Sequence, residues 1–217
     1  YEVDFVGHPL LDAIDKIEPK SSFREDWNLG RAPLIALLPG SRKQEISVKL
    51  PLMLSVMKDF PEHQFVLAGA PGIEPEYYLQ FAQSPRLKVI QNDTYQLLLH
   101  SEAALVTSGT ATLETALFEV PEVVCYKSSR ISYEIAKRLI KVKYISLVNL
   151  IMDREVVREL IQGELNYQNL KKELQSILPG GLKRRPMKDA FLELKKKLGE
   201  GGASERTAQL IVSRMKA

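Results

Sequence analysis

The sequence has the length and composition of a globular protein with an ordinary hydrophobic core. It contains 217 residues, of which 45% are hydrophobic, and its 30 Lys and Arg against 27 Asp and Glu leave a net charge of +3. This balance excludes a protein whose main partner is bulk nucleic acid. No apolar run approaches the roughly 18 residues that span a bilayer, and no secretion signal opens the chain. We therefore predict a cytoplasmic protein.

The first 31 residues have a mixed composition that is typical of a connecting segment. The chain begins with Tyr1 instead of methionine. We therefore expect the chain to be a piece of a longer protein, with residues 1–31 leading into the first regular domain.

From residue 32 onward, short apolar runs alternate with amphipathic helical patterns, which is typical of βαβ units and a parallel sheet. The predicted strands are 34–38, 64–68, 87–90, 103–107 and 122–126, and the predicted helices between them are 45–60, 74–82, 94–100 and 110–118. These elements predict an α/β fold, a doubly wound parallel sheet of about five strands in a Rossmann-like domain over residues 32–150.

After residue 126 the pattern changes to successive helices, predicted at 133–141, 154–162, 169–178, 186–198 and 204–215. Residues 151–217 are therefore expected to form a helical C-terminal extension. Its densest basic run lies between Lys183 and Lys197, and such a run could touch an anionic membrane surface. The alternative is an ordinary solvated helix face.

A first candidate loop, Gly40-Ser41-Arg42, directly follows the predicted strand 34–38. In an open parallel sheet ligands bind beyond the carboxyl ends of the strands. The glycine permits close backbone approach, the serine supplies a hydroxyl group, and Arg42 offers a planar fork for phosphate oxygens. The loop lacks the lysine and the spacing of a Walker A motif. Its alternative interpretation is a structural turn.

A second candidate loop, Ser108-Gly109-Thr110, joins the predicted strand 103–107 to the predicted helix 110–118. Free amides at a helix N-terminus attract anions, and Glu114, one turn later, can accept hydrogen bonds from a ribose diol. The alternative is an N-cap followed by an acidic first turn. Because both loops leave the same edge of one sheet, we predict a joint site for phosphate and ribose.

Residues that bind metals, form disulfides or act as general bases are scarce. The histidines His8, His63 and His100 are scattered and no Asp-x-Asp triplet occurs, so no metal site and no obvious base is predicted. His8 lies in a Gly-His-Pro turn, where we predict a structural role. The single cysteine, Cys125, lies in an apolar run and is expected in the core of a protein from a reducing compartment.

Four motifs occur in order along residues 7–162. They are Gly7-His8-Pro9-Leu10, the Pro-Gly-Ser-Arg run that ends at Glu45, the Thr-Ser-Gly-Thr-Ala-Thr run that ends at Glu114, and the stretch from Asp153 to Gln162. Together they resemble the successive signatures of the lipid-A-disaccharide synthase family. The resemblance implies the C-terminal, donor-binding half of a two-domain GT-B glycosyltransferase, which needs no cofactor.

The resemblance also implies a reaction and roles for single residues. The family transfers 2,3-diacylglucosamine from UDP-2,3-diacylglucosamine to 2,3-diacylglucosamine 1-phosphate, an acceptor of the lipid X type, and releases UDP. Arg42 and Arg154 would stabilise the leaving diphosphate, Glu114 would hold the ribose, and Asn149 would be a supporting polar group. The residues expected to bind the donor are Gly40, Ser41, Arg42, Ser108, Gly109, Thr110, Glu114, Asn149 and Arg154.

The sequence departs from the family pattern in one loop and lacks one domain. Asp153 stands where the family has asparagine or glycine, and Val148 where proline is frequent. In the family an N-terminal acceptor domain, which carries the expected general base, precedes the Gly-His-Pro turn, so we expect this chain to be inactive alone. Its C-terminal helices are expected to pack on the sheet, on the absent acceptor domain or on a partner subunit in a homodimer, and to approach the inner membrane.

Two other functions share parts of this pattern. Another GT-B UDP-sugar enzyme, such as a UDP-N-acetylglucosamine 2-epimerase, would have the same sheet, helix-start phosphate site and ribose glutamate. A non-catalytic nucleotide-binding domain is the second alternative. The first predicted strand lacks the G-x-G-x-x-G fingerprint, which argues against a dinucleotide.

Overall fold

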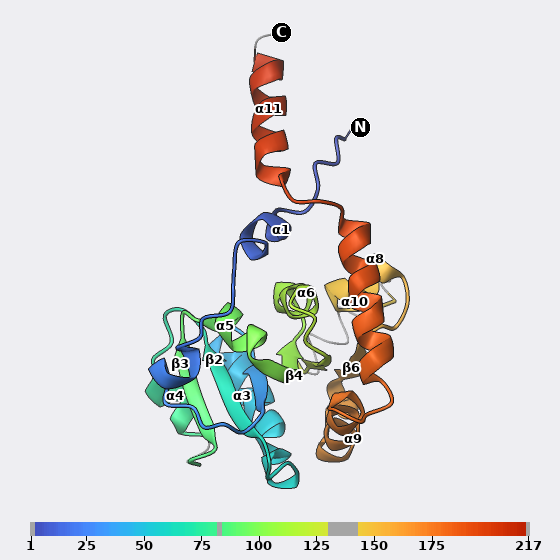
Figure 1. Cartoon of the computed structure of the whole chain (residues 1–217). Coiled ribbons are helices and arrows are strands. Elements are labelled where there is room, and N and C mark those ends of the chain that lie inside the picture. The colour runs from blue at the N-terminus through green and yellow to red at the C-terminus, as the bar shows by residue number, and fades with distance from the viewer. Residues whose placement is uncertain (1–2, 82–83, 130–142, 216–217) are drawn as a thin grey trace.

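A six-stranded parallel sheet forms the centre of the protein (Figure 1). The structure, a computed structural model, describes residues 3–81, 84–129 and 143–215. The strands are β1 (Leu34–Leu38), β2 (Gln64–Gly69), β3 (Leu87–Gln91), β4 (Ser101–Thr107), β5 (Glu122–Tyr126) and β6 (Arg158–Ile161). Their order in the sheet is β3-β2-β1-β4-β5-β6. The predicted doubly wound α/β fold is therefore confirmed.

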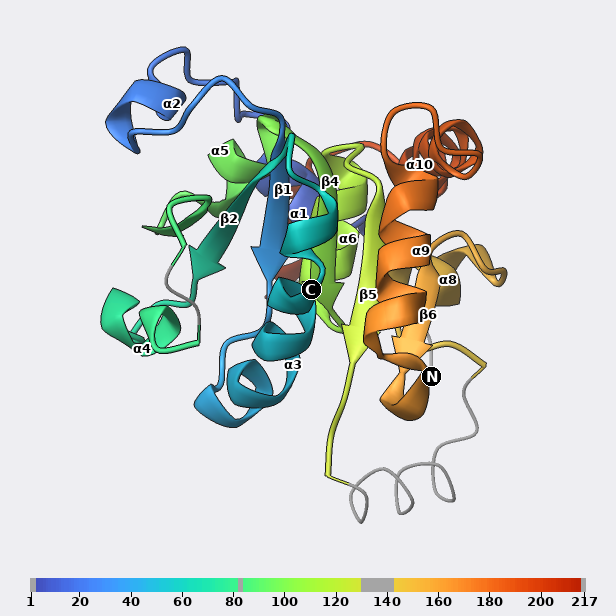
Figure 2. The same cartoon turned by 90° about the horizontal axis from the view of Figure 1, so that it is seen from below.

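Helices cover both faces of this sheet (Figure 2). The helices near the sheet are α3 (Lys43–Ser55), α4 (Pro75–Leu79), α5 (Thr94–Leu99), α6 (Thr110–Leu117), α8 (Leu147–Met152), α9 (Tyr167–Ile177) and α10 (Arg184–Leu198), with short 3₁₀ turns η1 (Met57–Asp59) and η2 (Gln162–Glu164). One face packs against α3 and α9, whereas α5 and α6 lie on the other face. Helices α8 and α10 pack outside α6.

Strand β1 shows why this sheet needs helices on both faces. All five of its residues are buried, and successive side chains of a strand point to opposite faces. Ile35 and Leu37 belong to the core cluster that contains residues of α3 and α9, and Leu34, Ala36 and Leu38 belong to the cluster that contains residues of α5. A continuous apolar run of this kind is typical of a buried parallel strand.

The prediction of a helix over 154–162 is wrong, because residues Arg158–Ile161 form β6, which pairs in parallel with β5. The sheet therefore continues beyond residue 150. A short run with apolar residues at 156, 157, 160 and 161 fits a helix as well as a strand, and periodicity alone cannot separate them. The backbone pairing with β5 decides in favour of the strand. The buried Glu159 side chain accepts hydrogen bonds from the backbone N–H groups of Ile145 and Ser146, which ties this strand to the segment before α8.

Other predicted elements differ less from the structure. The helix predicted over 45–60 is α3 followed by the separate turn η1, and the one predicted over 74–82 is the shorter α4. The helix predicted over 133–141 lies outside the described residues. The connecting segment contains two short helices, α1 (Pro9–Ile14) and α2 (Phe23–Asp26). Phe23 is fully buried and stacks on the His100 ring, which fixes α2 against the sheet domain.

Part of the basic run in the C-terminal extension is bound to the protein itself. Lys183 forms a 2.5 Å ion pair with Glu173 of α9, and Lys195 forms a 2.7 Å ion pair with Glu119. Buried side chains of α10, among them Phe191, complete the attachment of this helix to the domain. Within the described ranges, no helix has the length and apolar character required to cross a membrane.

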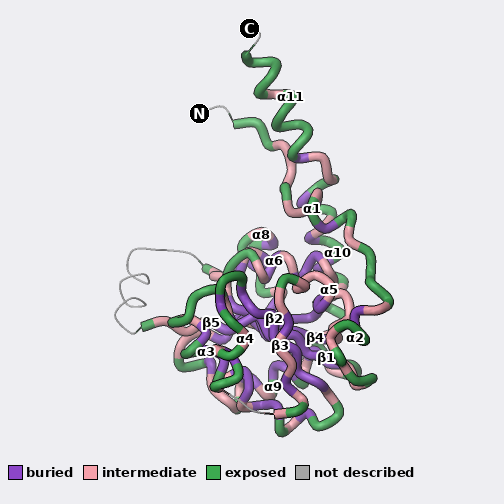
Figure 3. Tube along the Cα trace, turned by 90° about the vertical axis from the view of Figure 1, so that its left-hand side faces the viewer, coloured by how far each residue is buried: buried purple, intermediate pink, exposed green. Residues whose placement is uncertain are grey.

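The last helix, α11 (Ala203–Met215), projects from the body beside the N-terminal segment (Figures 1 and 3). The Asp12 carboxylate accepts hydrogen bonds from the backbone N–H groups of Gly202 and Ser204, and these bonds lower its pKa to about 2. Arg214 pairs with Asp4 at 2.6 Å. Apolar side chains remain exposed on this projection, namely Val3, Phe5, Ile211, Val212 and Met215.

A buried carboxyl group lies at the start of β5. Glu122 is fully buried, and neither of its side-chain oxygens has a hydrogen-bond partner among the described residues. Burial raises the pKa of this carboxyl group well above its ordinary value of 4.5. Above pH 4.5 the unfolded chain therefore releases a proton that the folded protein retains. The contribution of Glu122 to stability consequently falls as the pH rises toward the folded-state pKa.

Replacing Glu122 with methionine should stabilise the protein, and more so at higher pH. We expect Glu122→Met to raise the free energy of unfolding at pH 8 by about 1–3 kcal/mol, because the unpaired carboxyl group is removed. Urea unfolding at pH 5 and pH 8 measures both effects, with the exposed Glu62→Met as a control. A variant that is less stable than the wild type, or a difference that does not grow with pH, would contradict this account.

Candidate functional site

The topology brings two predicted loops together. Strands β1 and β4 are neighbours in the middle of the sheet, although β2 and β3 come between them in sequence. The chain runs outward in opposite directions from this pair, so the loops after β1 and β4 diverge and leave a crevice. A cavity of about 360 Å³ lies there, lined by Leu38, Gly40, Ser41, Arg42, Glu45, Ala68, Gly69, Ala70, Pro71, Thr94, Thr107, Ser108, Gly109, Thr110, Ala111 and Glu114.

The loop between β1 and α3 places an arginine at the start of a helix. Gly40 has a φ of +117°, a backbone conformation that residues with a side chain rarely adopt, so the loop requires glycine. Arg42 is the N-cap residue of α3, and no side chain caps the first turn of this helix. The Arg42 guanidinium is 81% exposed and lies 3.1 Å from the Glu45 carboxylate. It is therefore available to an anion in the cavity.

The loop between β4 and α6 presents a second open helix start. Gly109 is the N-cap residue, with a φ of +142°, and no side chain caps the helix. Two of the nearby hydroxyl groups are used within the protein: Ser108 donates to the carbonyl oxygen of Ile145 at 2.7 Å, and Thr112 donates to that of Gly109 at 2.8 Å. The backbone N–H groups at the start of α6 are therefore the natural donors to an anion.

Glu114 lies on α6, where the main cavity meets a second one. The second cavity, of about 410 Å³, shares Thr94 and Glu114 with the first. The Tyr95 hydroxyl group donates a 3.0 Å hydrogen bond to Oε1 of Glu114. Burial and the Glu114 charge raise the pKa of Tyr95 to about 12, so the phenol keeps its proton and fixes one oxygen of the carboxylate. The other oxygen remains available to a ligand hydroxyl group.

Two residues at this site carry no prediction from the sequence. Lys49 of α3 is buried beneath the cavity and donates a hydrogen bond to Oγ1 of Thr107, the last residue of β4. Its Nζ atom also lies 3.6 Å from Oε2 of Glu45. A signal exists in the sequence, since Lys49 falls four residues after Glu45 and interrupts the apolar stripe of α3. Tyr95 has no comparable signal, because its partner Glu114 lies on another helix.

Comparison with known proteins assigns the chain to a family. The family model described as lipid-A-disaccharide synthetase matches residues 1–212. The lipid-A-disaccharide synthase of Syntrophus aciditrophicus is 37% identical over 223 residues, with 99% of this chain and 58% of the relative covered. The lipid-A-disaccharide synthase of Persephonella marina is 34% identical, with 97% of this chain and 59% of the relative covered. The chain belongs to the lipid-A-disaccharide synthase family. It spans under three fifths of the length of these relatives.

Solved structures with the same fold share little sequence with this family member. The S. aureus MnaA structure determined with UDP has a TM-score of 0.62 at 16% identity, and the match covers 97% of this chain and 54% of the MnaA chain. The spinosyn rhamnosyltransferase SpnG, in complex with thymidine diphosphate, has a TM-score of 0.57 at 13% identity, and the match covers 83% of this chain and 46% of the SpnG chain. At these identities the likeness demonstrates a common fold, that of half of a GT-B protein.

Two of the site residues predicted from the family resemblance do not line the cavity. Asn149 is fully buried: its Nδ2 donates to the carbonyl oxygen of Val157 at 2.8 Å, and its Oδ1 accepts from the N–H of Val156 at 2.7 Å. Arg154 is half exposed and forms an ion pair with Glu193 of α10. Asn149 therefore supports the connection between α8 and β6, and Arg154 lies outside the lining of the cavity with part of its guanidinium paired to Glu193.

The departure from the family pattern at Asp153 has a backbone explanation. Asp153 ends α8 in the left-handed conformation, with a φ of +49°. Glycine adopts this conformation without strain, and asparagine and aspartate tolerate it better than most residues. Asparagine, glycine and aspartate can therefore replace one another here for a conformational reason, without any contact to a donor.

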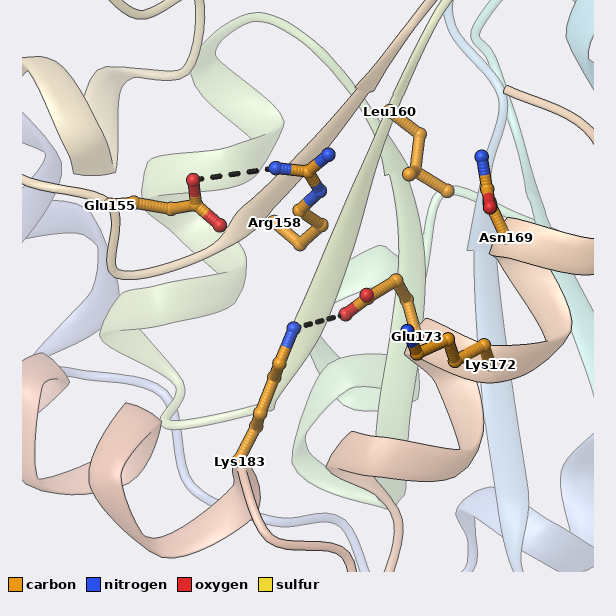
Figure 4. Close-up of a pocket in the computed structure, with 7 residues that line it drawn as sticks. All are labelled: Glu155, Arg158, Leu160, Asn169, Lys172, Glu173 and Lys183. Carbon is orange, nitrogen blue, oxygen red and sulfur yellow. Dashed lines mark hydrogen bonds and ion pairs between the residues drawn. The ribbon is translucent and has the colours of Figure 1, made fainter. Parts of the chain in front are cut away.

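A further cavity, of about 250 Å³, lies between β6, α9 and the start of α10 (Figure 4). Its lining has charged side chains of both signs. Arg158 lies 3.5 Å from the Glu155 carboxylate and 3.1 Å from that of Glu164, and Lys183 pairs with Glu173. Most of its charge is therefore neutralised within the protein, which makes this cavity a weaker anion site than the crevice between β1 and β4.

The remaining polar groups predicted from sequence have structural roles. The His8 Nδ1 atom accepts a 3.2 Å hydrogen bond from the N–H of Leu10 and caps α1, which confirms the predicted turn role. Cys125 is fully buried, and burial raises the pKa of its thiol to about 12. Within the described ranges, no cluster of three His, Cys, Asp or Glu side chains could hold a metal ion.

Proposed function

We propose that this chain binds the UDP part of a nucleotide-sugar donor in the crevice between β1 and β4. The observation that carries the proposal is the meeting of two uncapped helix starts, those of α3 and α6, at one cavity. Their N–H groups and Arg42 suit a diphosphate, whereas Glu114 suits the ribose hydroxyls. The nucleoside would then occupy the adjoining cavity that shares Thr94 and Glu114.

The proposed reaction of the whole protein is the formation of lipid A disaccharide 1-phosphate. The donor is UDP-2,3-diacylglucosamine, the acceptor is 2,3-diacylglucosamine 1-phosphate, and UDP leaves. Negative charge grows on the diphosphate as the glycosidic bond to it breaks. Arg42 and the N–H groups at the start of α6 stabilise that charge in the transition state. Arg154 remains a proposed second cation, and the general base is proposed to belong to the acceptor domain.

Calorimetric titration with UDP tests the site. Arg42→Ala and Glu114→Ala should each weaken binding by about tenfold or more, since hydrogen bonds to charged groups are typically worth about 1.5–3 kcal/mol. Arg31→Ala is a matched control, because Arg31 is exposed and precedes the amino end of β1, whereas Arg42 follows its carboxyl end. Wild-type affinity in both site variants would refute the assignment.

Because the donor site and the general base are proposed to lie in different domains, we predict donor binding without catalysis by this chain. The 217-residue chain should bind UDP but form no glycosidic bond when it is given both lipid substrates, because the proposed acceptor pocket and base belong to another domain. Mass spectrometry of the lipid products measures this. Disaccharide made by the purified chain would contradict the prediction. Tighter binding of UDP-N-acetylglucosamine than of UDP-2,3-diacylglucosamine would instead favour the epimerase alternative.

The projecting pair of α11 and the N-terminal segment is proposed to dock on the acceptor domain or on a partner subunit, near the inner membrane. Exposed Phe5, Ile211 and Met215 give this projection an apolar surface. If it binds a partner subunit, the full chain should sediment as a dimer and a chain that ends at Gly199 as a monomer. This shortened chain retains α10 and the sheet domain. A dimer, or binding to anionic vesicles, that survives the shortening would rule out α11 as its cause.

A further inference from the structure

Lys49 is a buried charged residue that lies outside the lining of the proposed donor site. Its side chain is 3% exposed. It comes from the face of α3 that also carries the buried residues Ile46, Leu50 and Met53. Burial lowers the pKa of this ammonium group, and Glu45 opposes that effect. A charged group that costs desolvation energy and could be replaced by an apolar side chain calls for a physical reason.

The contacts of Lys49 join the two loops of the crevice from below. Side chains along β4 alternate between the faces of the sheet, so Thr107 points to the same face as Leu105, toward α3. There its Oγ1 accepts the hydrogen bond from Lys49. A Cβ atom at Gly40 would lie 3.5 Å from the Lys49 Nζ atom. The ammonium group therefore lies against the end of β4 and against the turn that follows β1.

The charges at the cavity are unbalanced without Lys49. Among the described residues that line it, Arg42 is the one cation, whereas Glu45 and Glu114 are carboxylates. The Arg42 guanidinium and the Lys49 ammonium group share the Glu45 carboxylate, through Oε1 and Oε2 respectively. A diphosphate that entered such a site would meet more fixed negative than positive charge. Lys49 restores the balance without occupying space in the cavity.

We infer that Lys49 is a positioning residue of the donor site, which holds Glu45 and Thr107 in place and supplies a buried positive charge beneath the diphosphate. The inference rests on the proposed donor site. Because water is largely excluded around Lys49, its field is screened less than that of a surface lysine. The charge is felt by the phosphates of a ligand and not by its uncharged nucleoside.

The test compares UDP and uridine binding to the 217-residue chain, its Lys49→Met variant and a control. Methionine fills a similar volume without charge. The control is Lys171→Met, which removes a lysine that pairs with Asp59 at 2.7 Å, away from the crevice. We expect Lys49→Met to weaken UDP binding by about tenfold and to leave uridine binding unchanged, whereas Lys171→Met leaves both unchanged.

Thermal unfolding of the same variants separates a charge effect from damage to the fold. Glu45 is one-third exposed and keeps its pairing with Arg42, so Lys49→Met leaves no buried charge unpaired. We therefore expect the unfolding temperature of Lys49→Met to equal or exceed that of the wild type. UDP affinity equal to that of the wild type would overturn the inference. An equal loss for UDP and uridine would also overturn it, because the effect would then not depend on phosphate charge.

A measurement on the wild-type protein keeps the inference testable if Lys49→Met fails to fold. In protein with ¹³C-labelled lysine, the Cε resonance of Lys49 can be identified by its contacts to Thr107. Its surroundings contain Glu45 from its own helix and Cys125 from β5 as titratable groups. Saturating UDP should raise the pKa of this lysine, because a nearby anion favours the ammonium form. A pKa unchanged by bound UDP would overturn the inference, whereas a wild type that binds no UDP would refute the donor site itself.

Discussion

The adjacency of β1 and β4 in the middle of the parallel sheet is the constraint on which the proposed site depends. Parallel strands end at the same edge, so this pairing brings the turn at Gly40 and the turn at Gly109 to one crevice. Each turn is followed directly by a helix whose first N–H groups have no side-chain cap. The site is therefore built mainly from backbone groups, and side chains add charge and direction to it.

Buried charge beneath the crevice follows from the same arrangement. An open helix start suits an anion, but the carboxylates of Glu45 and Glu114 lie close by and oppose one. Lys49 lies where α3 packs on the end of β4, so a cation there reaches both loops without entering the cavity. Glu122, by contrast, is a buried carboxyl group with no side-chain hydrogen-bond partner among the described residues, at the opposite end of the strands. Lys49 thus has a proposed role at the donor site, whereas Glu122 lies away from that site.

The C-terminal part of the chain belongs to two structural units. Strand β6 completes the sheet, α9 covers it with buried side chains such as Leu174, and α10 packs on α6 and α8 with buried side chains such as Phe191. The helix α11 leaves this body and lies along the N-terminal segment, tied to it through Asp12 and Asp4. Residues about 200 positions apart in the sequence are joined there by polar contacts, such as those of Asp12 with Ser204 and of Asp4 with Arg214. Helix α11 buries little apolar surface, because Ala203 is its one buried residue. Its exposed apolar side chains are therefore proposed to cover a surface of another domain or subunit.

The sequence by itself determined five of the six strands, the two glycine loops and the family, because these depend on local patterns: apolar runs, turn glycines and ordered motifs. It did not determine β6, since residues 156–161 fit a helix and a strand equally well until their pairing with β5 is seen. It predicted Asn149 and Arg154 at the donor; packing turns Asn149 inward, and Arg154, which is paired with Glu193, stays a proposed donor contact. The tertiary structure decided that Lys49 and Tyr95 lie beside the proposed site, because Thr107 and Glu114, their partners on other elements, come near them only on folding.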